Sequence, residues 1–166
     1  MADADDVFPD RDMSHRDKVL FMLEREGWGM DNVPTQGEPP FPRYSYTIGL
    51  EDRFGFPELC VLGLSPVACR GLFDLVVGEL AAGTELPVGP PFIGLLDGGQ
   101  PCAFLALDGA SLAPMFPSLA EHLVATGRDP GSLRIVQLLW PDDHGRLPWD
   151  DGFDPKLAPA QLLLAE

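Results

Sequence analysis

Apolar residues recur every three or four positions in three stretches of the chain, which is the spacing of an amphipathic helix. The middle stretch has the clearest boundaries, because Ser65 and Pro66 suit the cap and the first turn of a helix and Gly83 suits its end. The pattern therefore predicts about three helices, over residues 14–27, 65–83 and 118–127.

Other stretches have the period of a β-strand. Residues 44–50 alternate strictly, with Tyr44, Tyr46, Ile48 and Leu50 on one face. Residues 58–64 are almost continuously apolar, which indicates a strand buried on both faces and paired with its predecessor. Shorter strand-like runs cover residues 28–33, 86–88, 92–96, 103–107 and 133–140.

The order of these elements has no regular alternation of strand and helix, which favours an α+β fold over a doubly wound sheet. We expect a single domain with a mixed or antiparallel β-sheet of about five to six strands and about three helices. Its 166 residues suffice for one core. Residues 1–13 carry little that could be buried and are predicted to form a flexible acidic tail, so that the domain covers residues 14–166.

Charge narrows the range of partners. The chain has 26 acidic side chains against 11 Lys and Arg, a formal net charge of -15. Such a field repels a phosphate backbone, and no segment concentrates basic residues, so we expect no nucleic-acid partner. The acidity favours solubility, with a basic protein or a cation as alternative explanations.

Cysteine usage and the termini indicate the compartment. Cys60, Cys69 and Cys102 lie far apart among aliphatic neighbours and are predicted to be buried free thiols. The N-terminus lacks the pattern of a secretory signal, and the apolar runs are too short to span a bilayer, so we expect a cytoplasmic protein without membrane contact. Pairing of exposed strand edges with a second copy leaves a homodimer as an open alternative.

Nucleotide and zinc motifs are missing from the sequence: it has no Walker or dinucleotide glycine spacing, no nucleophile elbow and no cysteine pair of zinc-ribbon type. No cofactor is therefore predicted.

The densest chemistry follows the last strand, between residues 137 and 151. Asp142, Asp143 and His144 offer metal-ligating groups there, although three consecutive residues seldom converge on one ion. A turn opened by the two aspartates, with Trp140 and Trp149 packing the tail against the sheet, explains the same residues without a ligand.

Tyr44 and Tyr46 are the other notable pair. Tyrosines on a half-buried strand face usually belong to the core or its rim, and their hydroxyls find local partners. A ligand pocket is the functional alternative, in which the two phenols orient a bound molecule and a charged residue completes the site. The candidate ligand-binding residues are Tyr44, Tyr46, Glu58, Trp140, Asp142, Arg146 and Trp149.

Five blocks together resemble the bacterial domain-of-unknown-function family 4262. They are P-P-F at 39–41, Y-S-Y-T-I-G-L at 44–50, F-P-E-L at 56–59, Q-L-L-W-P-D at 137–142 and P-W at 148–149. The resemblance implies a bacterial origin and a single domain but no activity. In that family a histidine often precedes the Pro-Glu-Leu block, whereas this chain has Phe56 there.

Two classes of function remain open at this point. The leading hypothesis is a non-enzymatic module that binds a protein or a small molecule, because no catalytic constellation is evident and an acidic surface suits a basic partner. The alternative is a small hydrolase or a metal-dependent enzyme, whose site joins the strand of Tyr44 and Tyr46 to the loop between Trp140 and Asp151.

Overall fold

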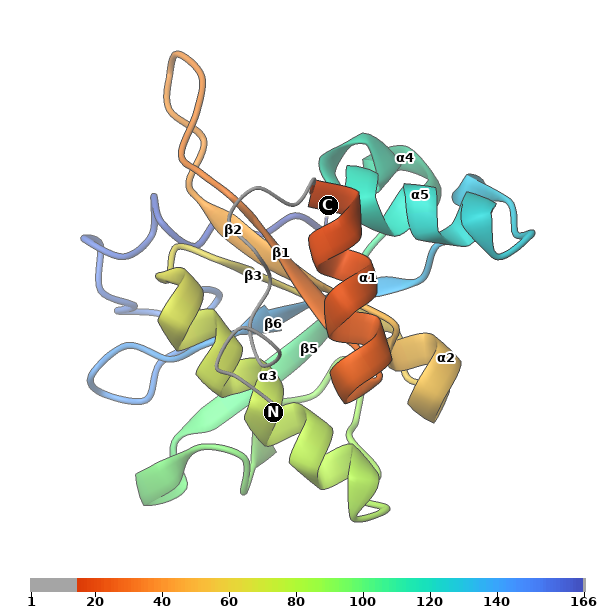
Figure 1. Ribbon diagram of the computed structural model, residues 1–166. Helices are drawn as coiled ribbons and strands as arrows, with labels where there is room; N and C mark the ends of the chain where they lie inside the picture. Colours follow the sequence, from red (N-terminus) through yellow and green to blue (C-terminus); the bar gives the residue numbers. More distant parts are fainter. Residues whose placement is uncertain (1–14, 166) are drawn as a thin grey trace, which may run out of the picture.

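One mixed sheet of six strands forms the centre of the molecule (Figure 1). The computed structural model describes residues 15–165, and the predicted tail at 1–13 lies outside this range. The strands are β1 Gly29–Val33, β2 Tyr44–Ile48, β3 Glu58–Leu62, β4 Phe92–Ile93, β5 Pro101–Ala106 and β6 Ile135–Leu139. Their order is β1-β2-β3-β6-β5-β4, and only the central β3 and β6 pair in parallel.

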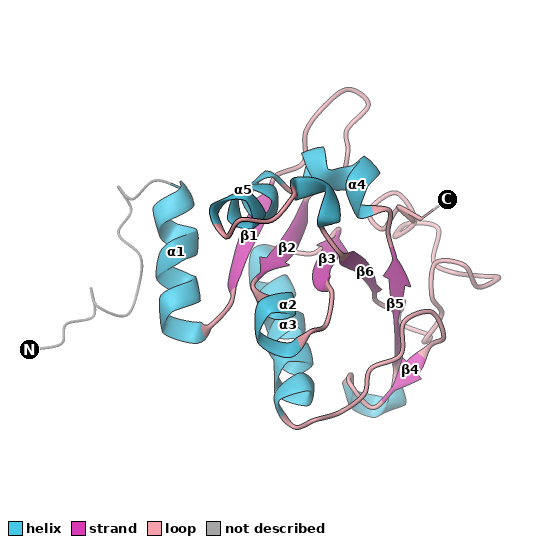
Figure 2. Ribbon diagram, turned by 90° about the vertical axis from the view of Figure 1, so that its right-hand side faces the viewer, coloured by secondary structure: helices cyan, strands magenta, loops and turns pink. Residues whose placement is uncertain are grey.

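Helices cover both faces of this sheet. They are α1 His15–Glu26, α2 Leu50–Phe54, α3 Pro66–Ala81, α4 Gly109–Leu112 and α5 Pro117–Ala125. Figure 2 shows α3 on one face, α4 and α5 on the other, and α1 beside the edge strand β1. The predicted α+β fold with a mixed sheet is confirmed. The expected number of about three helices is too low, because α2 and α4 are too short to show a helical period.

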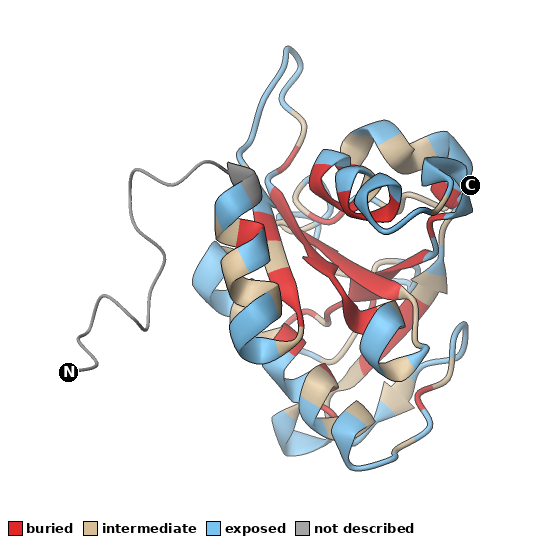
Figure 3. Ribbon diagram, turned by 45° about the vertical axis from the view of Figure 1, so that its right-hand side comes forward, coloured by how far each residue is buried: buried red, intermediate tan, exposed pale blue. Residues whose placement is uncertain are grey.

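The alternating strands build two large hydrophobic clusters, one on each face, and the strands β2, β3 and β6 are buried throughout (Figure 3). On the α3 face, Leu59 and Val61 of β3 pack with Phe73 of α3. On the opposite face, Tyr46 of β2 and Cys60 of β3 pack with residues of α5 and its approach. This arrangement follows from the period of two along each strand, which sends neighbouring side chains to opposite faces.

The strand predicted for residues 44–50 ends two residues early. Gly49 has a φ of +104°, a left-handed conformation that turns the chain out of β2 and directly into α2. Leu50 therefore packs on the α3 face, whereas Tyr44, Tyr46 and Ile48 pack on the other. An added Cβ at Gly49 would also lie 2.7 Å from the Leu23 side chain, so the close approach of α1 requires glycine.

The segment after β6 returns to the sheet as an irregular tail, as its composition predicted. The Gln161 side chain bonds both the N–H and the carbonyl of Trp140, and the Gln137 side chain bonds Leu162 and Leu164 in the same manner. These four bonds hold the tail against β6 without a further strand. Within residues 15–165, no helix combines the length and apolar character that crossing a bilayer requires.

Candidate functional site

Asp142, the centre of the predicted polar loop, is committed to the backbone of its own loop. Its carboxylate accepts hydrogen bonds from the backbone N–H groups of His144 (2.9 Å), Arg146 (2.9 Å) and Asp154 (3.0 Å). The Arg146 Nε lies 3.3 Å from the same carboxylate. Burial raises the pKa of Asp142, but these donors outweigh it, so the pKa lies below 3.8. The carboxylate thus shapes the turn.

Asp143 and His144 lie exposed beside this turn. Across the described residues, no group of three or more His, Cys, Asp or Glu side chains is arranged to hold a metal ion. The two tryptophans of the segment differ in position. Trp140 is buried on the α3 face, where its Nε1 donates to the Leu62 carbonyl at 2.9 Å, whereas Trp149 is 40% exposed.

Glu58 is a buried carboxylate at the start of β3. It accepts hydrogen bonds from the N–H groups of Gly49, Leu50 and Glu51 and from the Thr47 hydroxyl, at distances of 2.8 to 3.2 Å. Its role is therefore to bind the first turn of α2. Burial raises the pKa of Glu58 to about 7, although the four donors act in the opposite direction.

The two tyrosines lie on the face covered by α5, where their hydroxyls find partners inside the protein. Tyr44 donates to the carbonyl of Met115 at 2.7 Å, and burial raises its pKa to about 12. Tyr46 donates to the Asp31 carboxylate at 2.7 Å, and the hydroxyl of Ser118 bonds the same oxygen at 2.6 Å. The N–H of Ser118 donates to the Tyr46 oxygen. This closed network fixes the start of α5 to β1 and β2.

The structure does not join the tyrosines to the loop after β6 through a polar contact. Among residues 17–165, no hydrogen bond or ion pair links Tyr44 or Tyr46 to the segment 140–151. Trp140 packs on the opposite face of the sheet from both phenol rings. Trp140 bonds to Leu62 at the end of β3, whereas Glu58 lies at the start of β3, where it is bonded to α2.

A second polar cluster lies where α5 meets α2. His122 Nε2 is 2.8 Å from one oxygen of Asp52, and Arg128 Nη1 is 2.8 Å from the other. Burial raises the pKa of Asp52, but its hydrogen bonds to His122 and Arg128 hold it below the usual value. His122 is 8% exposed, and its packed ring hydrogen-bonds the Asp52 carboxylate.

A long loop projects between β1 and β2 (Figure 1). A cleft of about 270 Å³ opens at its base, on the α3 side of the edge strands. Its lining combines apolar side chains with one arginine, one amide and the hydroxyl-bearing side chains of one serine and one tyrosine. The lining residues are Asn32, Val33, Pro34, Arg43, Tyr44, Ser45, Leu64 and Pro66. Ser45 Oγ donates to Asn32 Oδ1 at 2.6 Å, which fixes the amide at the rim.

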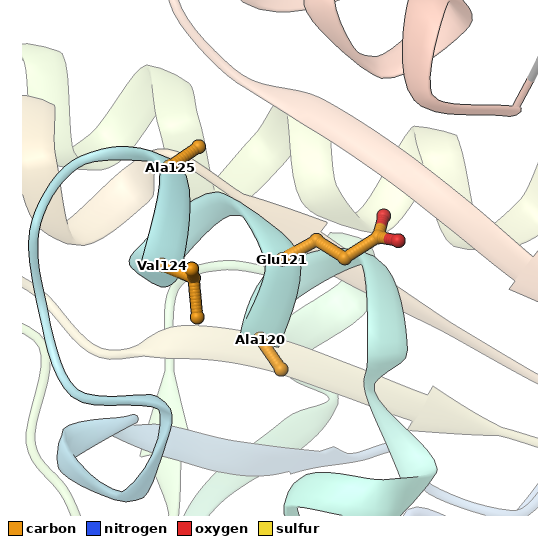
Figure 4. A pocket seen from close by; sticks show the side chains of 4 residues that line it. All are labelled: Ala120, Glu121, Val124 and Ala125. Atoms are coloured by element: carbon orange, nitrogen blue, oxygen red, sulfur yellow. The ribbon is translucent and has the colours of Figure 1, made fainter.

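A larger and more open hollow of about 500 Å³ lies on the outer surface of α5. Ala120, Glu121, Val124 and Ala125 line it, and Figure 4 shows the Glu121 carboxylate pointing away from the side chains of Ala120 and Val124. Its described lining therefore offers small apolar groups without convergent polar ones. The cleft at Arg43 is smaller but has both kinds of group, so it is the better candidate site.

The protein-family comparison decides the relationship of the chain. Residues 22–154 match the model of the domain of unknown function DUF4262. The chain belongs to this family. Neither the curated proteins nor the solved structures contain a match. In this DUF4262 domain the match includes all eight residues of the cleft, whereas the tail bonded by Gln137, at Leu162 and Leu164, lies beyond it.

The sequence analysis identified Tyr44 but missed its neighbours in the cleft. The available signal was modest: Arg43 is the only Lys or Arg between Glu26 and Asp52, and the alternation of β2 sends Ser45 to the face opposite the tyrosines. Phe56, which directly precedes the Pro-Glu-Leu block, packs edge-on against Phe104, with ring centroids 5.6 Å apart. Phe56 is half-buried and packs against the hydrophobic cluster on the α3 face.

Proposed function

We propose that this domain is a non-enzymatic binding module for a small molecule, held in the cleft at Arg43. The observation that carries the proposal is the combination of a concave, mostly apolar lining with polar groups that the fold leaves available. Ligand pockets generally have this composition. The volume of about 270 Å³ lies just below the usual range of about 300–1,000 Å³, which favours a ligand of one ring or a short chain.

The commitments of the other candidate groups support binding over catalysis. The carboxylates of Asp142 and Glu58 accept backbone N–H groups, and the phenol of Tyr46 is closed into a network with Asp31. A general base must be free to reach a substrate proton. Because these groups hold the fold together, none of them is free to act as a general base. A binding role therefore fits the domain better than a catalytic one.

The same proposal places the module in the bacterial cytoplasm. Cys60, Cys69 and Cys102 are free and buried, which is the state expected in a reducing compartment. The net charge of -15 opposes contact with nucleic acids and leaves a small molecule as the preferred partner.

Fragment binding followed by amide NMR tests the proposal. We would titrate the ¹⁵N-labelled protein with single-ring probes, namely benzoate, benzamide and benzyl alcohol, up to about 10 mM, since weak fragments bind in the millimolar range. At least one probe should shift amides at residues 32–33, 43–45 and 64. Asn32→Trp, which fills the exposed rim of the cleft, should abolish the shifts.

The matched control is Leu75→Trp, which adds the same bulk on the exposed side of α3, away from the cleft. It should leave binding intact. Binding that survives Asn32→Trp, or an absence of shifts at the cleft with all three probes, would refute the proposal.

A further inference from the structure

Arg43 differs from the other arginines of the described chain in having no partner. Five arginines contact a carboxylate or carbonyl oxygen, namely Arg53, Arg70, Arg128, Arg134 and Arg146. Arg25 lies over the ring of Phe21. The guanidinium of Arg43 forms no hydrogen bond, ion pair or ring contact with residues 17–165.

An unpaired cation is unexpected in this chain, because acidic side chains outnumber basic ones by 26 to 11. Arg43 is also the only ionisable group other than Tyr44 among the described residues that line the cleft. Guanidinium groups bind carboxylates strongly and in a fixed geometry. The cleft therefore offers one positive charge that the protein itself does not neutralise.

The neighbourhood of Cys69 shows which way the charge lies. Burial raises the pKa of the Cys69 thiol, while a hydrogen bond with Ser45 and the positive charge of Arg43 lower it. Cys69 belongs to the cluster on the α3 face, beneath Ser45. The charge of Arg43 therefore acts on a thiol of the α3 face, and Arg43 itself lines the cleft.

Asn32 supplies a second donor at the same rim. Because its Oδ1 accepts the hydroxyl of Ser45, its Nδ2 group turns away from Ser45, and it donates to no residue in the described range. Val33, Pro34 and Leu64 provide the apolar part of the lining. A planar anion on a small apolar body would satisfy both kinds of surface.

We infer, on the basis of the proposed function, that the ligand is a small apolar monocarboxylate whose carboxylate pairs with Arg43 and Asn32. A monoanion is favoured over a phosphate dianion because one guanidinium balances one charge and the surrounding field of -15 repels a second. The apolar part of the ligand lies against Pro34 and Leu64.

The test compares benzoate with benzamide, which have the same shape and differ in charge. Benzoate should bind about 10-fold or more tighter than benzamide, since charge-assisted hydrogen bonds are about twice as strong as neutral ones. Arg43→Gln should weaken benzoate about 10-fold and leave benzamide unchanged, and Arg43→Lys should restore part of the loss. Arg134→Gln, which removes an exposed arginine paired with Glu51, is the control and should change neither.

Three results would overturn the inference, and they can be told apart. Equal binding of the two probes, unaffected by Arg43→Gln, rejects the carboxylate while the binding module stands. If inorganic phosphate competes with benzoate for the cleft and binds more tightly than benzoate does, the preference for a monoanion is rejected. Binding of none of the probes at the cleft rejects the proposed function and the inference together.

Discussion

Arg43 and Asp142 occupy equivalent places in the fold and are used in opposite ways. Arg43 immediately precedes β2 and Asp142 follows β6, and both lie at the same edge of the sheet because β2 runs antiparallel to β3, which is parallel to β6. Asp142 is buried, and three backbone N–H groups and Arg146 surround its carboxylate. Arg43 is exposed, and its guanidinium forms no hydrogen bond, ion pair or ring contact with a described residue.

The difference shows that a high density of charged residues does not make a group available. The segment 137–151 contains most of the conspicuous chemistry, but its central carboxylate stabilises its own turn. Glu58 is the extreme case of the same use, since α2 begins on its carboxylate. Loss of the Glu58 or Asp142 carboxylate should therefore destabilise the fold, whereas loss of the Arg43 guanidinium should not.

Removal of the Glu58 carboxylate should have the largest effect. Glu58→Ala leaves three backbone N–H groups and the Thr47 hydroxyl without their acceptor in a buried place, at a cost of roughly 3–5 kcal/mol of unfolding free energy. Urea unfolding followed by circular dichroism measures it. The exposed Glu121→Ala on α5 is the control and should change the free energy by less than about 0.5 kcal/mol. A similar, small loss in both variants would show that Glu58 does not hold α2.

The pH dependence of stability should reveal the same carboxylate. Its pKa rises from 4.5 in the unfolded chain to about 7 in the folded protein, so the folded state retains a proton that the unfolded state releases. The resulting stabilisation is complete below pH 4.5 and is lost as the pH rises through 7, about 3 kcal/mol in all.

Comparison with Glu58→Gln, which does not titrate, isolates this effect from the other acidic groups. The unfolding free energy of the wild type minus that of Glu58→Gln should increase as the pH is lowered from 8 to 4.5. A difference that stays constant across this window would mean that the pKa of Glu58 is not raised.

The sequence predicted the sheet far better than the contacts that complete it. The apolar run of β3 and the Ser65-Pro66 start of α3 are local signals, and both elements lie where they were expected. The turn into α2 depends on the left-handed Gly49 and on the Glu58 carboxylate, which lies beyond α2 at the start of the next strand. A single sequence does not show such tertiary partners.

The same limit applies to the candidate site. Tyr44 was identified from its strand pattern, but the cleft beside it combines β1, β2 and the start of α3, and only the fold brings these together. Whether a charged group is paired is likewise a tertiary property. The sequence could show that Asp142 and Arg146 are close neighbours, but not that Arg43 would be left without a partner.

Asp142→Asn should have an intermediate effect. One oxygen is replaced by an amide that faces N–H donors, so the melting temperature should fall by about 3–6 °C at pH 7. Because the folded pKa of Asp142 lies below 3.8, the stabilisation is present above that value and is lost as the pH falls through the folded pKa. Asp143→Asn, at the exposed neighbour, serves as the control in differential scanning calorimetry. Equal melting temperatures for the two variants at pH 7 would remove the contrast with Arg43.

Arg43→Gln should have the smallest effect on stability, because the guanidinium has no hydrogen bond, ion pair or ring contact to lose within the described residues. Replacing an unpaired surface cation changes the unfolding free energy by less than about 0.5 kcal/mol, so the melting temperature should stay within about 2 °C of the wild type. Arg146→Gln, which loses the bond to Asp142, is the matched comparison and should melt lower than Arg43→Gln. A fall for Arg43→Gln as large as that for Arg146→Gln would show that the fold already uses this charge, and Arg43 would then belong with Glu58 and Asp142 among the groups that hold the structure together.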